Sequence, residues 1–211
     1  MIHLGVLASG RGTNLQAIID AIEQGAVEAR VAVVISNRPE AYALARASGH
    51  RIAARVVQEE DYPSRQEHNR RMVTILTEFE VDLVVLAGYD RVLHPEFVRA
   101  FSMRIINVHP SLLPAFGGGL HAQEDALRYG VKVTGCTIHF VNEDVDGGPI
   151  ILQESVPVLD GDTEESLSLR ILEQEHRVLP RAIQLFAHGS LRVEGRRVYG
   201  TDLTPNLGAR G

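Results

Sequence analysis

The sequence has very little cysteine and no recognisable metal motif. Cys136 is the single cysteine among 211 residues, so no disulfide can form within the chain, and a reducing compartment is expected. Spacings such as CxxC and HExxH are absent, and the histidines follow no metal-ligand pattern, so we predict no metal. No general base can be assigned to Cys136, which is therefore expected to be a small buried residue rather than a nucleophile.

Long hydrophobic segments and an excess of basic residues are also missing. The apolar stretch at the N-terminus lacks the length and the basic start of a signal peptide, and no run reaches the roughly 20 residues of a membrane span. Acidic residues (27) outnumber lysine and arginine (21), for a net charge of −6, which disfavours a nucleic-acid partner. We expect a cytoplasmic monomer or homodimer that binds small molecules, with no membrane or nucleic acid as partner.

What the sequence does contain is an alternation of short apolar runs with helical patterns, typical of βαβ units around a parallel sheet. Strands are expected near residues 3–8, 30–36, 52–57, 81–88, 104–109, 133–141 and 149–158. Helices are expected near residues 14–25, 39–49, 64–79, 95–101 and 163–188, the last of them open to interruption at Pro180. A small hairpin is expected over residues 191–200.

This pattern predicts an α/β, Rossmann-like fold: a mostly parallel twisted sheet with helices on both faces and a β-rich C-terminal extension. We expect a single domain over residues 1–211. Within it, residues 1–110 would form a phosphate-binding βαβ half, and residues 111–211 a β-rich half that ends in the long helix.

A glycine-rich loop, SGRGTN (9–14), follows the first expected strand. Backbone N–H groups at the start of a helix form an anion site, in which Gly12 allows close approach while Thr13 and Asn14 can cap the helix or donate to phosphate oxygens. A dinucleotide fingerprint would need glycine where Leu15 stands and an acid after the second strand, which is absent. These departures disfavour NAD and favour a monophosphate. A plain tight turn with a helix cap is the alternative.

Asn107 and His109 stand two residues apart at the end of an expected strand, so their side chains face the same way. Pro110 holds His109 in an extended geometry, and ligands of parallel sheets bind beyond these strand ends. An amide and an imidazole together suit a reaction in which negative charge develops on an oxygen. The alternative is a polar pair that merely caps a loop.

A third residue, Asp146, lies in the turn sequence DGGP. A carboxylate close to an imidazole favours the protonated ring, and it can also relay protons through water. The alternative is an aspartate that only forms the turn. His139 alternates with apolar residues, which suits a strand histidine as well as a site residue.

Together these stretches resemble the folate-dependent formyltransferases, and among them those that act on glycinamide ribonucleotide. The resemblance covers nearly the whole chain: LASGRGTNLQAII, VVLAGYDRVL, INVHPSLLPAF, TIHFVNEDVDGGPIILQ and LEQEHRVLP. The string NVHPSLLP joined to a downstream DGGP is the most specific part.

The resemblance implies a reaction and a set of roles. The formyl group of 10-formyltetrahydrofolate, the co-substrate, would pass to the amine of glycinamide ribonucleotide through a tetrahedral intermediate, a step of purine biosynthesis. It implies Asn107, His109 and Asp146 as the catalytic residues, with His139 in support. It implies Gly12, Thr13, Asn14 and Glu175 on the ribonucleotide, and Asn107, Arg65, Asp90, Arg91, Val92 and Leu93 on the folate.

Two features depart from the resembled pattern. Asp90 stands where the family usually carries an apolar residue, often methionine, and an acid there could alter folate affinity. The loop Ala115–Gly119 is longer by one residue and lacks the usual Pro-Gly, which puts its path over the substrate site in doubt.

Three related functions are alternatives. A formyltransferase acting on methionyl-tRNA would need a further C-terminal domain and a basic face, and a formyltetrahydrofolate hydrolase an additional N-terminal regulatory domain; neither is expected here. A non-catalytic binding module of the same fold would have lost the Asn/His/Asp trio. An assay of tetrahydrofolate release that depends on added ribonucleotide separates all of these from the expected enzyme.

Overall fold

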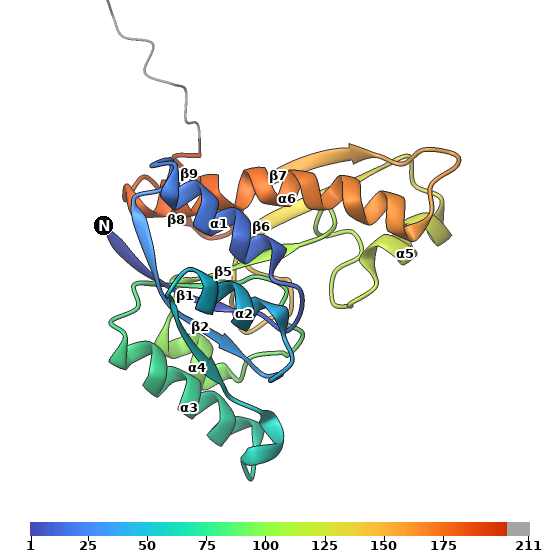
Figure 1. Ribbon diagram of the computed structural model, residues 1–211. Helices are drawn as coiled ribbons and strands as arrows, with labels where there is room; N and C mark the ends of the chain where they lie inside the picture. The colour runs from blue at the N-terminus through green and yellow to red at the C-terminus, as the bar shows by residue number, and fades with distance from the viewer. Residues whose placement is uncertain (202–211) are drawn as a thin grey trace, which may run out of the picture.

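The computed structural model describes residues 1–201, which form one main sheet flanked by helices (Figure 1). The strands of this sheet are β1 (Ile2–Leu7), β2 (Ala29–Ser36), β3 (Ala53–Val56), β4 (Leu83–Leu86), β5 (Ile105–His109), β6 (Val133–Phe140) and β7 (Ile150–Pro157). A separate hairpin consists of β8 (Arg192–Glu194) and β9 (Arg197–Tyr199). The end of the expected domain, residues 202–211, lies outside the described residues.

The main sheet has the order β3-β2-β1-β4-β5-β6-β7. Its first five strands pair in parallel, whereas β6 pairs antiparallel with β5 and β7 antiparallel with β6. The predicted α/β fold, mostly parallel with a β-rich second half, is confirmed. The order reverses at β1, which pairs with both β2 and β4, and such reversals open a crevice beyond the strand ends.

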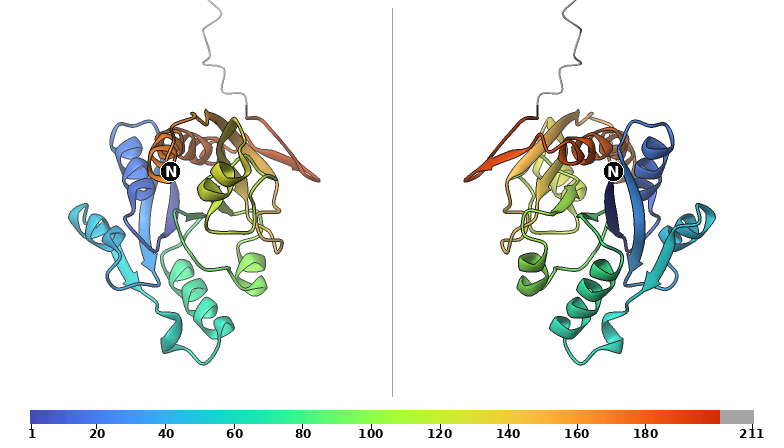
Figure 2. Two further views of the ribbon diagram at one scale, coloured as in Figure 1. Left: turned by 90° about the vertical axis from the view of Figure 1, so that its right-hand side faces the viewer. Right: turned by 90° about the vertical axis from the view of Figure 1, so that its left-hand side faces the viewer.

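The helices are α1 (Thr13–Glu23), α2 (Tyr42–Gly49), α3 (Arg65–Glu78), α4 (Pro95–Ala100), α5 (Ala122–Tyr129) and α6 (Glu164–Ala187), with a short 3-10 turn η1 (Glu59–Asp61). Helices α1, α2 and α6 share one hydrophobic cluster with the sheet, and α3 and α4 share another. The side views show α3 on the opposite side of the sheet from α1 and α6 (Figure 2). The helices therefore cover both faces, as the sequence predicts.

The two-residue period of β1 decides which helices it contacts. Leu4 and Val6 point into the cluster that contains α1 and α6, and Leu7 points into the cluster that contains α3 and α4. Gly5 faces α3 so closely that an added Cβ would lie 2.3 Å from a methyl group of Leu76. Burial on both faces explains why the central strands are continuous apolar runs.

Two elements differ from the sequence expectations. Helix α5 follows the Gly-rich stretch directly and was not predicted, because it has only eight residues and buries only Ala122 and Ala126, too short a segment to identify as a helix from its apolar pattern. Helix α6 continues through Pro180, which is buried on its packed face. Proline removes one backbone hydrogen bond from a helix, and the apolar contacts of neighbouring residues such as Leu179 and Ile183 hold the helix together across that gap.

Candidate active site

Three loops leave the same edge of the sheet from neighbouring strands. Strands β1, β4 and β5 lie side by side and run parallel, so their carboxyl ends meet at one edge. The glycine loop 9–14 follows β1, the segment 87–93 follows β4, and Asn107 and His109 end β5. The sheet therefore brings together three predicted site segments that lie far apart in the sequence.

Gly12 is the residue on which the glycine loop depends. It forms the N-cap of α1 with a φ of 69°, and a Cβ at this position would lie 2.8 Å from the Cα of Ala43 in α2. Only glycine satisfies both the left-handed backbone and the close contact. No side chain caps α1, so the alternative in which Thr13 or Asn14 caps the helix is wrong. The first N–H groups of the helix remain open to an anion.

Asn14 points inward to Glu175 of α6 instead of capping the helix. Its Nδ2 donates to Glu175 Oε2 at 2.8 Å, and both residues are 7% exposed. Burial raises the pKa of Glu175 above its ordinary value, although the hydrogen bond from Asn14 opposes the shift. The Oδ1 of Asn14 is buried without a hydrogen-bond partner among the described residues.

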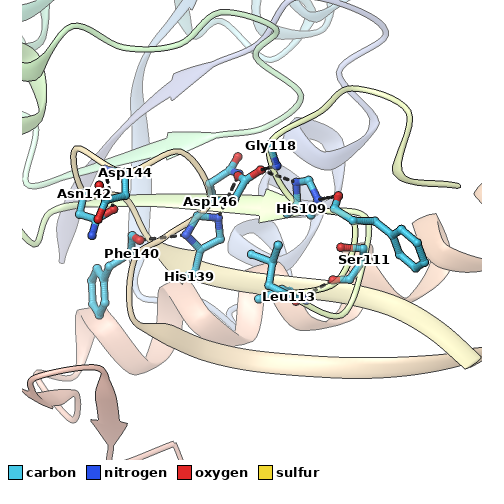
Figure 3. A network of polar contacts seen from close by, with 12 residues as sticks. His109, Ser111, Leu113, Gly118, His139, Phe140, Asn142, Asp144 and Asp146 are labelled. Carbon is cyan, nitrogen blue, oxygen red and sulfur yellow. Dashed lines mark hydrogen bonds and ion pairs between the residues drawn. The ribbon is translucent and has the colours of Figure 1, made fainter. Parts of the chain in front are cut away.

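His109 and Asp146 form the centre of a second cluster (Figure 3). The Nδ1 of His109 lies 3.4 Å from Asp146 Oδ2, and its Nε2 lies 3.0 Å from the backbone oxygen of Phe116. A carbonyl oxygen can only accept, so Nε2 carries a hydrogen. The Nδ1 atom faces the carboxylate of Asp146.

The loop after His109 also contacts Asp146. The N–H of Gly118 donates to Asp146 Oδ2 at 2.7 Å (Figure 3). Both Phe116 and Asp146 adopt positive φ angles, 55° and 52°, which are costly for residues other than glycine. The loop 115–119, whose path the sequence left in doubt, thus supports the imidazole with a carbonyl and the carboxylate with an N–H.

Asn107 is held by His139 from the adjacent strand β6. The two residues face each other across the β5–β6 ladder, with Asn107 Nδ2 3.2 Å from His139 Nε2. The Nδ1 of His139 lies 2.9 Å from the oxygen of Phe140 and must donate to it. Burial lowers the pKa of His139, so its ring is neutral and Nε2 accepts from Asn107.

Asp146 lies between the two histidines (Figure 3). Its Oδ1 is 3.7 Å from His139 Nε2, beyond hydrogen-bond distance. Since that nitrogen acts as an acceptor, this contact is no charged pair. The carboxylate is 13% exposed and directs its stronger contacts to His109 and Gly118. The three residues singled out from the sequence, Asn107, His109 and Asp146, therefore lie in one cluster.

A cavity of about 430 Å³ opens beside this cluster. Its lining includes two sets of residues. The first is the cluster just described, Asn107, His109, His139 and Asp146, and the second is the segment after β4, Asp90, Arg91, Val92 and Leu93. Apolar side chains such as Leu86, Val98 and Val141 form part of its wall. An apolar cavity with a few converging polar groups is the usual form of a small-molecule site.

Other predicted site residues lie elsewhere. Gly12, Thr13, Asn14 and Glu175 do not line the 430 Å³ cavity; a larger groove of about 690 Å³ between α1 and α6 includes Thr13 but none of the catalytic cluster. Arg65 begins α3 at the exposed end of that helix and is not part of either lining. Arg91 does line the 430 Å³ cavity, and its Nε pairs with Glu59 at 3.2 Å.

Sequence reasoning missed the supports that come from the backbone. The carbonyl of Phe116 and the N–H of Gly118 are invisible in side-chain chemistry, and only the Gly-rich composition of 117–119 marks a loop that can approach a site closely. Within residues 1–201, no cluster of three potential metal ligands is present. No helix in that part of the chain has the length and apolarity needed to cross a membrane.

The fold and this site define a formyl transferase: residues 3–183 match that family, and the chain belongs to it. A solved structure named glycinamide ribonucleotide transformylase 1, from Symbiobacterium toebii, is 55% identical, with a TM-score of 0.92 over 94% of this chain and 93% of that one.

Curated relatives agree. Phosphoribosylglycinamide formyltransferase of Haemophilus influenzae is 42% identical over 94% of this chain and 93% of its own length. The trifunctional purine biosynthetic protein adenosine-3 of Gallus gallus is 45% identical over 91% of this chain. The chain spans only 19% of the length of that larger protein.

Proposed function

We propose that this protein transfers the formyl group of 10-formyltetrahydrofolate to the amine of glycinamide ribonucleotide, giving formylglycinamide ribonucleotide and tetrahydrofolate. The observation that carries the proposal is the contact of His109 Nδ1 with Asp146 Oδ2 at 3.4 Å, beside Asn107 and on the wall of one cavity. Membership of the formyl transferase family and the relatives named above support the same reaction.

In this reaction the amine nitrogen attacks the formyl carbon, and negative charge develops on the formyl oxygen. Asn107 offers an amide N–H to that oxygen, since its other N–H is held by His139 Nε2 at 3.2 Å. We assign His109, which lies on the wall of the same cavity, as the second group that stabilises this charge. Donors fixed in advance stabilise such an oxygen without having to reorganise.

One proton has to move from the attacking amine to the departing folate nitrogen. Asp146 is the group we assign to this step: it accepts a proton from the amine, directly or through water, and returns one to the folate nitrogen. Its contacts with His109 Nδ1 and Gly118 N hold it in place for both halves of the transfer. No bond forms between the protein and either substrate.

The two substrates would approach from opposite sides of this cluster. The open N–H groups at the start of α1 suit a phosphate, and the Asn14–Glu175 pair lies beside them, so we assign Gly12, Thr13, Asn14 and Glu175 to the ribonucleotide. The 430 Å³ cavity, with the backbone of Asp90, Arg91, Val92 and Leu93 on its wall, is assigned to the folate. Residues 1–110 then form the phosphate half of a single domain, and the C-terminal half completes the folate side. Arg65 is retained as a cation for the glutamate tail of the folate.

The test follows tetrahydrofolate release from 10-formyltetrahydrofolate spectrophotometrically, with and without glycinamide ribonucleotide. The proposal expects release only when the ribonucleotide is present, together with one formylated ribonucleotide for each folate released. Release without the ribonucleotide would indicate a hydrolase. No release under either condition, in protein shown to be folded, would indicate a binding module. Either result overturns the proposal.

A further inference from the structure

Asp90 closes a ring of hydrogen bonds that joins three strand ends. The N–H of Asp90 donates to Ser9 Oγ at 3.0 Å, and the hydroxyl of Ser9 donates to Asn37 Oδ1 at 2.6 Å. The Nδ2 of Asn37 then donates back to Asp90 Oδ1 at 3.0 Å. The ring begins and ends on Asp90, and each of its three residues donates one hydrogen bond and accepts one.

The ring lies at the point where β1 pairs with β2 on one side and β4 on the other. Ser9 follows β1, Asn37 follows β2 and Asp90 follows β4, and the N–H of Ser9 also donates to the oxygen of Gly88 at 3.0 Å. Ser9 and Asn37 are only 7% and 6% exposed. Because β2 and β4 do not touch each other in the sheet, the ring is a direct side-chain link between their ends.

Arg38 completes the arrangement from outside. Its guanidinium donates to Asp90 Oδ2, the carboxylate oxygen that the ring leaves free. Burial by itself would raise the pKa of Asp90, but the polar contacts of Asn37 and Ser9 and the charges of Arg38 and Arg91 outweigh it, and the pKa is lowered. The acid at this position is therefore ionised, neutralised by a neighbouring cation and held toward the end of β2.

We propose that Asp90 is a positioning residue: through the Ser9–Asn37–Asp90 ring and Arg38 it fixes the backbone of residues 88–93 that forms the folate wall of the cavity. This inference rests on the proposed function, because it assigns that wall to a folate. The inference explains how an acid can stand in this wall. The charge of Asp90 is paired with Arg38, and its backbone N–H donates to Ser9 as part of the ring.

The position of the ring also relates the two substrates. Ser9 immediately precedes the glycine loop assigned to the ribonucleotide phosphate, and Asp90 lies within the segment assigned to the folate. A shift at either end is transmitted through hydrogen bonds of 2.6 to 3.0 Å. A link of this kind holds the wall assigned to the folate in a fixed position, so its loss should weaken folate binding more than it slows the chemical step.

Three variants test the ring. Ser9→Ala removes one donor and one acceptor from the ring and leaves the side chain of Asp90 in place. Asp90→Leu removes both carboxylate contacts, and the double variant combines the two changes. We expect each single variant to raise the KM for 10-formyltetrahydrofolate and the Kd for tetrahydrofolate, measured by calorimetry, by about tenfold. We expect kcat to change by less than about threefold and the double variant to be no worse than Asp90→Leu, because residues of one network are not additive.

A conservative variant and a remote control complete the experiment. Asp90→Asn can accept from only one of its two donors and should lie between wild type and Asp90→Leu. Asp160→Asn, in an exposed pair with Lys132, should leave all constants unchanged.

Several outcomes would overturn the inference. If Ser9→Ala binds tetrahydrofolate normally while Asp90→Leu does not, Asp90 acts by direct contact with the ligand rather than through the ring. If both variants lower the melting temperature but leave KM and Kd unchanged, the ring only stabilises the fold. Failure of wild type to bind tetrahydrofolate at all is a different result, and it counts against the proposed function itself.

Discussion

The carboxamide of Asn107 is held in one orientation by His139, whose Nε2 lies 3.2 Å from Asn107 Nδ2. His139 can only accept at that atom, because its Nδ1 donates to the oxygen of Phe140 at 2.9 Å and burial lowers its pKa. The bond therefore decides which end of the amide is Nδ2, and so which end offers an N–H to the formyl oxygen.

His139→Leu is expected to lower kcat by about tenfold or more, since the amide of Asn107 can then rotate and present its oxygen to the developing charge. His139→Gln restores an acceptor and should recover part of the rate. The KM for each substrate should change little in both variants, because the effect is on orientation. Steady-state kinetics of the three proteins measure this, and a His139→Leu variant with wild-type kcat would contradict the orienting role.

Gly12→Ala is expected to destabilise the protein by about 1–2 kcal/mol from the left-handed backbone alone, with more from the contact of the new Cβ with Ala43 at 2.8 Å. Gly10→Ala is the matched control in the same loop, since its Cβ would meet nothing within 4 Å. Chemical denaturation of both variants measures the difference. Equal stabilities would show that the loop does not need the conformation seen at Gly12.

Glu175→Gln is expected to raise the free energy of unfolding at pH 8 by about 1–3 kcal/mol, the usual scale for a buried polar group left unsatisfied. The new amide keeps an acceptor for Asn14 Nδ2 and offers an N–H to Asn14 Oδ1, which has no partner among the described residues. It also removes a buried carboxylate whose pKa is raised by burial.

The sign of the pH effect follows from that raised pKa. The folded protein binds a proton more tightly at Glu175 than the unfolded chain does, so wild type loses stability as pH rises from the ordinary glutamate range through the folded pKa. The advantage of Glu175→Gln should therefore grow with rising pH and vanish near pH 4. Denaturation curves at several pH values test this, and an advantage that is constant with pH would contradict it.

Asp162 anchors the start of α6, and its pKa is shifted in the opposite direction from that of Glu175. Its carboxylate accepts hydrogen bonds from both terminal nitrogens of Arg170 at 2.8 Å and from the N–H of Leu159 at 2.7 Å. These contacts, chiefly the one with Arg170, lower the pKa of the carboxyl. Its stabilising effect is present above the ordinary aspartate range and is lost as pH falls below about 4.

Asp162→Ala should therefore lower the melting temperature at pH 7, and the gap from wild type should be smaller at pH 3 than at pH 7. Calorimetric scans at pH 7 and pH 3 measure both quantities. Asp160→Ala, two residues away and 96% exposed at the side chain, is the control and should match wild type. A control variant as unstable as Asp162→Ala would assign the effect to the loop rather than to this carboxylate.

Local patterns were sufficient to predict most of the sheet and to place Asn107 and His109 together at the end of one strand. Buried parallel strands are continuous apolar runs, so the segment 81–88 gave β4 directly, and the two-residue period placed Asn107 and His109 on one side of β5. Helix α5 was missed because it has only eight residues and buries only two alanines.

Long-range contacts could not be predicted in the same way. The hydrogen bond of Asn14 is made to Glu175, 161 residues away in the chain, whereas local patterns offered only a helix cap or a phosphate donor. Asp146 and His109 are 37 positions apart in the chain. Both are held by backbone groups of one loop, His109 by Phe116 O and Asp146 by Gly118 N. The Ser9–Asn37–Asp90 ring likewise exists only once three strand ends are brought together.

The most direct test of the account is the rate of formyl transfer in Asn107→Ala, His109→Ala and the double variant, each shown to be folded. We expect each single change to lower kcat by at least about a hundredfold, the usual cost of losing a donor to a developing oxyanion, and the double variant to be little slower than the worse single one. Single variants that transfer the formyl group at near wild-type rates would contradict the assignment of this site.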